Sequence, residues 1–371
     1  MCRRSKDDQL SEEPQTTTPT DLSASARNYA REEDARAIGS NVLGLINIFG
    51  QHMNLETLDG VTLAYDYGEA LRELDRGVET SSDLSFSKEW GIGVAMTPAV
   101  LRDGVLKSHI LFNAAILEGL MDEPDSEACQ AVVHIIAHEC AHVEINAIKD
   151  RQFPGVILRY RADTWYEGLR LEVIEASWDE YAACRISAGF GNDPSENYQG
   201  VFLNILGEAG PNVREAILKC RHDADYDALM IEAQRNIGNL VKYASYVLGT
   251  ADGLDQDIET DLREISEALE GHWFSPFFLR LRDAHRVLWE RYGQWESLTE
   301  FETIADIWLE MLADRGVEVT PQEDGRMYVN IPFRADTSSF QAMMWGIRQA
   351  AKGSQGWQLP TDRDDKGSEP S

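Results

Sequence analysis

The chain has 371 residues, 43% of them hydrophobic, which is enough to bury a large core in one or two domains. Its 64 acidic residues outnumber 34 basic ones and give a formal net charge of −30, which argues against binding to nucleic acids. The sequence has no apolar run long enough for a signal segment or a membrane span. Its cysteines lack a CxxC spacing and fit a reduced, cytoplasmic setting.

The N-terminal part of the chain is predicted to combine helices with a small sheet. Residues 1–24 form a polar tail that we expect to be disordered, and a helix over 25–49 follows. A strand over 61–65 and a helix over 65–76 follow. Two further strands, over 90–98 and 107–117, are expected on either side of a turn at Asp103–Gly104. The segment from His109 to Ile116 is either an edge strand that pairs with an extended substrate or an ordinary core strand.

The most informative motif is His-Glu-Cys-Ala-His at residues 138–142. Asp125 or Ser126 caps a predicted helix that ends near Lys149 or Asp150, so the motif lies well inside it. On a helix, His138 and His142 leave the same face one turn apart, and both can bind one zinc ion. Glu139 lies beside the first histidine and can act as general base toward a zinc-bound water.

A catalytic zinc needs a third protein ligand, and the next predicted helix, over 164–187, offers one. Glu175 and Asp179 are four residues apart on this helix, so their carboxylates share a face at the border of an apolar stripe. We expect Glu175 to bind the metal and Asp179 to accept the free ring N–H of a ligand histidine. Asp179 or Glu180 as the ligand is the alternative.

These two motifs resemble the gluzincin group of zinc metallopeptidases. The stretch from Glu175 to Ala183 is also similar to the second-helix motif of the HtpX-type and the ImmA/IrrE-like bacterial peptidases. The resemblance implies a zincin-like fold with Zn²⁺ held by His138, His142 and Glu175. It also implies that Glu139 is the general base and that Asp179 accepts a hydrogen bond from a ligand histidine. It covers about 92–190; Trp178 departs from the pattern, because a small residue is usual there.

The rest of the chain is predicted to be mostly helical, so the fold class is α+β. A break at Gly189–Pro194 separates a zinc-binding part, 25–190, from a helical part, 191–353, and residues 354–371 form a second polar tail. A hairpin is expected near 317–331 and a last helix over 338–352. Helices between them are expected at 197–208, 212–221, 225–248, 258–270, 276–292 and 297–314.

Together these features predict a zinc metallopeptidase whose partner is a peptide or protein substrate, without nucleic acid or membrane. Zinc lowers the pKa of its bound water to about 7, and Glu139 takes the proton as this water attacks the scissile carbonyl. His134 lies one turn before His138 and is expected to line the cleft. Candidates for stabilising the oxyanion are His222, His272, His285, Tyr160, Tyr166 and Tyr181.

Two other classes of function are compatible with the sequence. One is a regulatory or sensor protein that keeps the fold and the zinc but acts by binding. The other is a helical interaction scaffold in which the motif has no chemical role.

Overall fold

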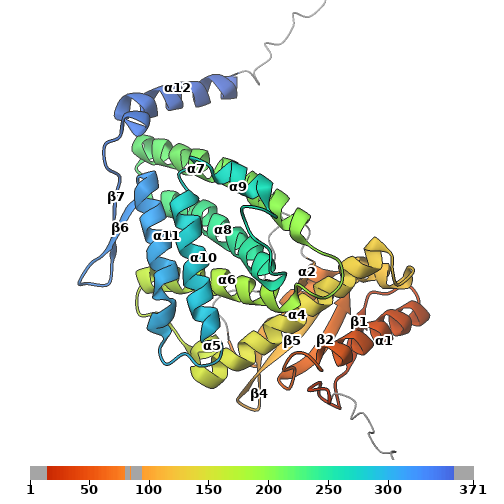
Figure 1. The fold of residues 1–371 in the computed structure, drawn as a ribbon. Helices are drawn as coiled ribbons and strands as arrows, with labels where there is room; N and C mark the ends of the chain where they lie inside the picture. The colour runs from red at the N-terminus through yellow and green to blue at the C-terminus, as the bar shows by residue number, and fades with distance from the viewer. Residues whose placement is uncertain (1–14, 80–83, 85–93, 355–371) are drawn as a thin grey trace, which may run out of the picture.

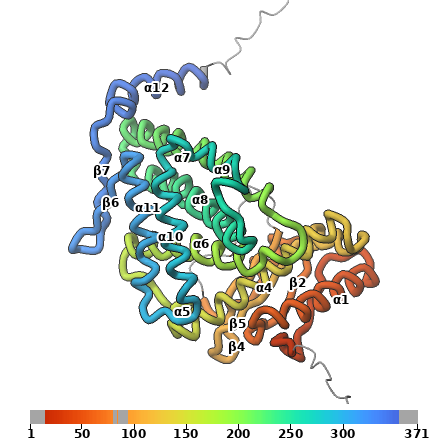
Figure 2. Tube along the Cα trace, in the orientation of Figure 1, coloured from red at the N-terminus to blue at the C-terminus, as the bar shows by residue number. Residues whose placement is uncertain are grey.

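The computed structural model describes residues 15–79, 84 and 94–354 (Figures 1 and 2). The fold is α+β and mostly helical, as predicted, with a small mixed sheet near the N-terminus. The strands are β1 (Ala24–Arg27), β2 (Leu58–Ala64), β3 (Ala95–Met96), β4 (Ala99–Arg102), β5 (Val105–Asn113), β6 (Glu318–Pro321) and β7 (Met327–Asn330).

The helices cover most of the remaining chain. The α-helices are α1 (Glu32–Phe49), α2 (Tyr67–Arg72), α3 (Ala114–Leu117), α4 (Glu127–Gln152), α5 (Val156–Arg159), α6 (Trp165–Ser187), α7 (Ser195–Asp223), α8 (Tyr226–Gly253), α9 (Arg263–Leu269), α10 (Ser275–Glu290), α11 (Glu302–Arg315) and α12 (Ser339–Ser354). Short 3-10 helices are η1 (Glu118–Met121), η2 (Leu298–Phe301) and η3 (Ala335–Thr337).

The N-terminal sheet has β5 in its interior. β1, β2 and β5 run parallel, and β3 and β4 pair antiparallel with the other edge of β5. The expectation that 109–116 forms an edge strand is therefore wrong. The core-strand alternative holds for 109–113, residues 114–116 belong to α3, and β3 is the outer strand at this level. The turn at Asp103–Gly104 is confirmed, since both residues have positive φ (51° and 79°). Of the strand predicted from Trp90 onward, 90–93 lie outside the described residues.

Residues 15–31 differ from the pattern read in the sequence. The Thr17 hydroxyl donates to the Gly50 and Met53 carbonyls at 2.9 and 2.6 Å, which ties this segment to the end of α1. Residue 24, predicted as the end of the tail, and residues 25–27, predicted as helix, form β1 beside β2, with Ala24 opposite Val61. The helix starts only at Glu32 because pairing with β2 satisfies the preceding backbone in an extended conformation.

α4 and α6 form as predicted, and their first turns show why. The Ser126 side chain accepts from the Cys129 N–H at the start of α4, and Thr164 accepts from Glu167 N–H at the start of α6. α4 lies on the sheet, where the Asn146 amide donates to Ser108 Oγ of β5 at 3.1 Å. α6 packs against α4 on one side and α8 on the other.

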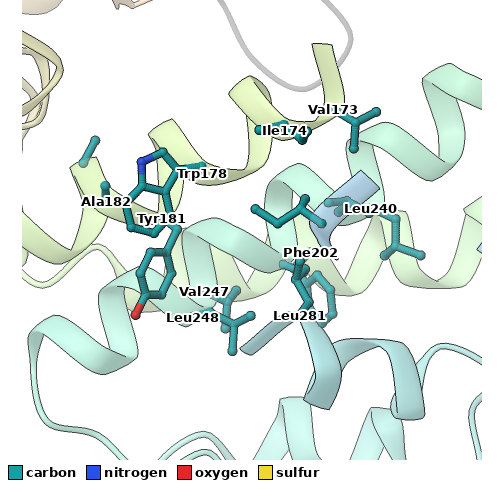
Figure 3. Packing of buried hydrophobic residues seen from close by; sticks show 14 of the residues in the cluster. Val173, Ile174, Trp178, Tyr181, Ala182, Phe202, Leu240, Val247, Leu248 and Leu281 are labelled. Carbon is teal, nitrogen blue, oxygen red and sulfur yellow. The ribbon is translucent and has the colours of Figure 1, made fainter. Parts of the chain in front are cut away.

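One continuous apolar core joins the sheet, α4, α6 and the later helices. Figure 3 shows its centre, where α6 contributes Val173, Ile174 and Trp178 and meets Leu240 and Leu248 of α8. The four cysteines of the described chain, at 129, 140, 184 and 220, are buried and unpaired, as expected for small core residues. No described helix is both long and apolar enough to span a membrane.

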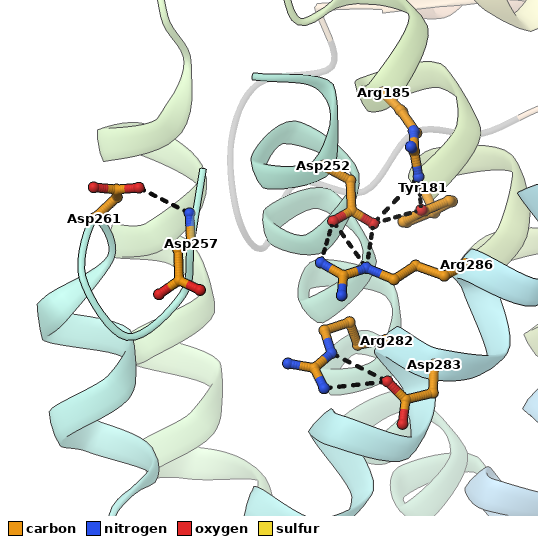
Figure 4. A network of polar contacts seen from close by, with 8 residues as sticks. All are labelled: Tyr181, Arg185, Asp252, Asp257, Asp261, Arg282, Asp283 and Arg286. Atoms are coloured by element: carbon orange, nitrogen blue, oxygen red, sulfur yellow. Dashed lines mark hydrogen bonds and ion pairs between the residues drawn. The ribbon is translucent and has the colours of Figure 1, made fainter. Parts of the chain in front are cut away.

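A charged cluster joins the ends of α6, α8 and α10 through hydrogen bonds and ion pairs (Figure 4). Asp252, whose side chain is only 7% exposed, accepts from the Tyr181 hydroxyl at 2.7 Å and from Arg286 at 2.6 Å. Arg185 also reaches this carboxylate, at 3.3 Å. Burial alone would raise the pKa of Asp252, but Arg286, Tyr181 and Arg185 outweigh burial and lower it.

The C-terminal elements follow the prediction closely. β6 and β7 form the expected hairpin, and α12 is the predicted last helix, lying across α7 (Figure 1). The helices predicted at 197–208 and 212–221 are one helix, α7, which continues through Pro211.

Candidate metal centre

α4 and α6 bring two histidines and one glutamate together at a buried point. The two ring Nε2 atoms of His138 and His142 are 3.2 Å apart. Glu180 Oε2 lies 3.3 Å from His138 Nε2 and 3.5 Å from His142 Nε2. These three residues form a group that could hold a metal ion.

The spacing of the three atoms fits a zinc ion. Ligands at about 2.0–2.1 Å from zinc in a tetrahedral arrangement are about 3.3–3.4 Å from one another, which agrees with the separations of 3.2, 3.3 and 3.5 Å found here. Glu180 Oε2 is buried and has no aligned hydrogen-bond partner among the described residues. A buried carboxylate oxygen without such a partner is costly, and a metal ion would satisfy it.

The second oxygen of Glu180 faces a cation. Lys242 of α8 places its Nζ 3.1 Å from Glu180 Oε1, so the two oxygens of one carboxylate have different neighbours. Burial would raise the pKa of Glu180, but Lys242 and then the two histidines hold it well below its ordinary range. Burial would lower the pKa of His142, and Glu180 more than offsets that effect and raises it. The carboxylate is thus held ionised, which is the form that binds metals.

Glu139 is buried on the same helix and is oriented from the sheet side. The Thr97 hydroxyl, next to β3, lies 2.6 Å from Glu139 Oε2 and 3.1 Å from the Glu139 carbonyl oxygen. Glu139 also contributes to the raised pKa of His142, which places its charge near the histidines. One carboxylate of α4 is therefore positioned beside the metal-binding group but outside it.

The expected third ligand, Glu175, and its companion Asp179 lie at a different point along α6. Lys149 of α4 donates to both oxygens of Asp179, at 3.1 and 3.0 Å. The Glu175 carboxylate also raises the pKa of Lys149. The group near the histidines contains Glu180 instead, the alternative left open by the sequence. Asp179 therefore forms an ion pair that joins α4 to α6, where a bond to a ligand histidine was expected.

Replacing Lys149 should strongly destabilise the fold. The side chain of Lys149 is 10% exposed and that of Asp179 is 22% exposed, so Lys149→Met leaves two carboxylates without their cation. We expect the free energy of unfolding to fall by about 3 kcal/mol, the lower end of the range for a broken buried pair because Asp179 is partly solvated. Denaturant unfolding measures this change.

The exposed Lys219 of α7 provides a matched control. Lys219→Met should change the free energy of unfolding by less than about 0.5 kcal/mol. Burial disfavours the Lys149 ammonium, but Asp179 and Glu175 outweigh burial and raise its pKa. Stability from this pair is therefore complete below the unfolded pKa of about 10.4 and is lost as the pH rises through the higher folded value. An equal loss of unfolding free energy in Lys149→Met and Lys219→Met would contradict the assigned Lys149–Asp179 ion pair.

The side chains considered for oxyanion stabilisation have partners elsewhere in the structure. His285 is fully buried between Ser177 and Ser245, with its pKa lowered by burial to about 3. Tyr181 donates to Asp252, and Tyr160 donates to Glu167. The other candidates contact further groups: His222 lies near Trp345, His272 near Trp273, and Tyr166 near Arg170.

His134 lies behind the metal-binding group. Its Nδ1 is 3.1 Å from the Phe190 carbonyl and its Nε2 is 3.3 Å from the Tyr198 hydroxyl. Burial lowers the pKa of His134 to about 4, with a smaller effect from His138. Both ring nitrogens are engaged by protein groups, so His134 supports the packing around His138.

Residues of α7 and α8 that no local sequence pattern predicted also surround the histidines. Besides Lys242, Tyr246 stacks on the His138 ring with centroids 5.9 Å apart, and Tyr198 packs against Tyr246 at 4.9 Å. Lys242 and Tyr246 are four residues apart, so they share a helix face. The sequence offered one signal, a lysine placed among the apolar residues Val241 and Ala244. This signal does not indicate which helix Lys242 contacts.

Trp178, the departure from the family pattern, points away from the metal-binding group. It packs among aromatic residues that follow α10, including Trp295 at 5.5 Å and Phe301 at 5.7 Å between ring centroids. The indole therefore fills the core on the opposite side of α6 and does not crowd the α4–α6 contact.

Comparison of the chain with models of protein families, with curated proteins and with solved structures gives no significant match. The metal-binding group of His138, His142 and Glu180 is therefore the structural support for a zinc site of the His-Glu-x-x-His kind.

Proposed function

We propose that this protein is a zinc-dependent peptidase whose metal ligands are His138, His142 and Glu180. The observation that carries the proposal is the set of three nitrogen and oxygen atoms 3.2–3.5 Å apart, beside the separate carboxylate of Glu139. Two imidazoles, one carboxylate and an open fourth position are the donor set of a catalytic zinc site.

Each residue has a distinct part in the proposed reaction. A bound zinc ion would supply Lewis acidity, polarising the scissile carbonyl and lowering the pKa of a water molecule. Glu139 takes the proton of the attacking water and returns it to the leaving amine. Thr97 orients Glu139 through its 2.6 Å hydrogen bond, and Lys242 fixes the Glu180 carboxylate through its outer oxygen.

A groove between α6 and α8 has one residue, Lys242, in common with the surroundings of this site. It has a volume of about 350 Å³ and is lined by Val173, Ala176, Gly238 and Lys242, among others. Lys242 is 34% exposed at its side chain and contacts Glu180 directly. Lys242 therefore connects the groove to the proposed metal ligands.

A second candidate function is a regulatory or sensor protein that binds zinc without cleaving peptides. The low exposure of the three metal-binding side chains, 10%, 19% and 13% for His138, His142 and Glu180, favours it. A polypeptide substrate needs more access than a metal ion does.

Metal content and chelator sensitivity of the purified full-length chain test the proposal. We expect about one zinc ion per chain, as for a fully formed site. Peptide cleavage should disappear on chelation and return on adding zinc. Metal well below stoichiometric amounts after purification without chelators would exclude a resident zinc. Stoichiometric zinc without cleavage of a diverse peptide library would favour the regulatory candidate.

A further inference from the structure

A basic pocket lies far along the fold from the metal-binding group, between α7, the start of α10, the end of α11 and α12. Its volume is about 720 Å³, within the range of small-molecule sites. Five basic side chains line it: Arg214, Arg315, Arg334, Arg348 and Lys352. Only Glu215 and Asp336 are acidic there, whereas acidic residues outnumber basic ones 64 to 34 in the whole chain.

The positive charges of this basic pocket are only partly neutralised. Arg214 and Arg334 share Asp336 at long distances of 3.8 and 3.9 Å. Arg348 and Lys352 are exposed on α12, and neither has an ion-pair partner within the described ranges. Arg315 forms an ion pair with Asp314, so Arg348 and Lys352 supply the charge that is left over. Because charges beyond a Debye length of about 8 Å are largely screened at physiological salt, these nearby cations act on a ligand in the pocket more strongly than distant acidic residues of the chain do.

Two tryptophans give the basic pocket flat apolar walls. Trp273 lies under the Arg315 guanidinium, whose carbon is 4.2 Å from the ring centroid, and it packs against Gly210 of α7. A Cβ at Gly210 would lie 3.3 Å from the Trp273 indole nitrogen, so glycine allows the close approach. Trp345 of α12 is held by a hydrogen bond of 3.3 Å from its indole N–H to Glu215. An anion with a planar ring would contact both the basic side chains and the aromatic walls.

The size and charge of the basic pocket select a small ligand. Guanidinium groups bind phosphate oxygens in pairs of hydrogen bonds, and aromatic side chains stack on nucleobases. A long nucleic acid would be repelled by the acidic remainder of the surface, whereas a single nucleotide fits within the pocket. Burial, and then the charge of Arg315, lower the pKa of His272 in the same wall, in keeping with a positive local potential.

We propose that the basic pocket binds a nucleoside polyphosphate. The phosphate groups lie among Arg214, Arg334, Arg348 and Lys352, and the base stacks on Trp345. This site is separate from the proposed zinc centre and does not depend on its activity.

Calorimetric titration of the full-length chain with ATP at 0.15 M salt tests this proposal. We expect saturable binding of one ATP per chain. The variant Arg348→Gln/Lys352→Gln should bind about 10- to 100-fold more weakly, because it loses two charge-assisted contacts. The control variant Arg36→Gln/Arg326→Gln removes the same charge from exposed positions on α1 and the hairpin and should bind as the unmodified chain does.

Two further ligands distinguish the possible sources of binding. Tripolyphosphate should bind more weakly than ATP, since it lacks a base, and Trp345→Leu should reduce this difference. Equal affinity for tripolyphosphate and ATP would overturn the nucleotide assignment. Tighter binding of an acidic peptide than of ATP would assign the pocket to a protein partner instead. Equal ATP affinity in the two double variants, or no ATP binding at millimolar concentration, would also overturn the proposal.

Discussion

Glu180→Gln is expected to release the metal ion, with zinc affinity lowered by at least about 100-fold. Loss of a residue that hydrogen-bonds to a metal ligand commonly lowers metal affinity about 10–100-fold, and the loss of a ligand itself should lower it at least as much. Glutamine keeps the size of the side chain but removes the charge that faces both histidine nitrogens at 3.3 and 3.5 Å. Competition with a chromophoric zinc chelator measures the affinity.

Glu175→Gln is the matched control, because it makes the same chemical change five residues earlier on the same helix. Glu175 raises the pKa of Lys149 and is not part of the metal-binding group. Zinc affinity should therefore stay within about threefold of that of the unmodified chain. This is a smaller change than the roughly tenfold loss expected when a residue that hydrogen-bonds to a metal ligand is replaced. A greater loss of zinc in Glu175→Gln than in Glu180→Gln would contradict the arrangement of α4 and α6 described above.

Glu139→Gln should keep the metal ion and lose hydrolysis. A positioned general base contributes about 10²–10⁴-fold to rate, so cleavage should fall by that factor while zinc content stays stoichiometric. The carboxamide can still accept a hydrogen bond from Thr97, which lies 2.6 Å from the carboxylate, so the side chain should keep its place. Cleavage of the whole proteome by the two forms would measure the difference and identify substrates.

Thr97→Val provides the companion variant to Glu139→Gln. It leaves the Glu139 carboxylate intact but removes its hydrogen bond, so hydrolysis should fall less than in Glu139→Gln, with zinc retained. Loss of zinc in Glu139→Gln would contradict its assignment as base. Full biological activity of Glu139→Gln, together with bound zinc, would show that the protein acts by binding.

Local signals were sufficient to predict the two helices of the candidate metal centre. Ser126 and Thr164 cap them as the sequence suggested, and the spacing of His138 and His142 brings their ring nitrogens to 3.2 Å. These features depend on neighbours three or four residues apart, which a helix fixes by its own geometry.

The third member of the metal-binding group could not be chosen from local signals. Glu175 and Glu180 are separated by five residues, or about 140° around the helix, so at most one of them faces the histidines. The choice depends on the antiparallel contact of α6 with α4, in which His142 meets Glu180 and Lys149 meets Asp179. The pairing of Lys149 with the Glu175–Asp179 face is a tertiary contact that the spacing of acids does not reveal.

Strand pairing was hidden from the sequence for a similar reason. Residues 24–27 continue into a polar, helix-like pattern, yet they form β1 because β2 offers a parallel partner. The position of β5 inside the sheet depends on β2 at one edge and on β3 and β4 at the other. Neighbours distant in the sequence therefore determine which strands have free edges.

The contact between Lys242 and Glu180 has a consequence for folding without metal. A carboxylate buried beside two imidazoles would normally oppose folding until a cation arrived. Here the chain carries its own cation, 3.1 Å from the outer oxygen, and a large apolar core surrounds the group. We therefore expect the polypeptide to fold without a bound metal ion, unlike small zinc domains, whose folding energy comes from the metal.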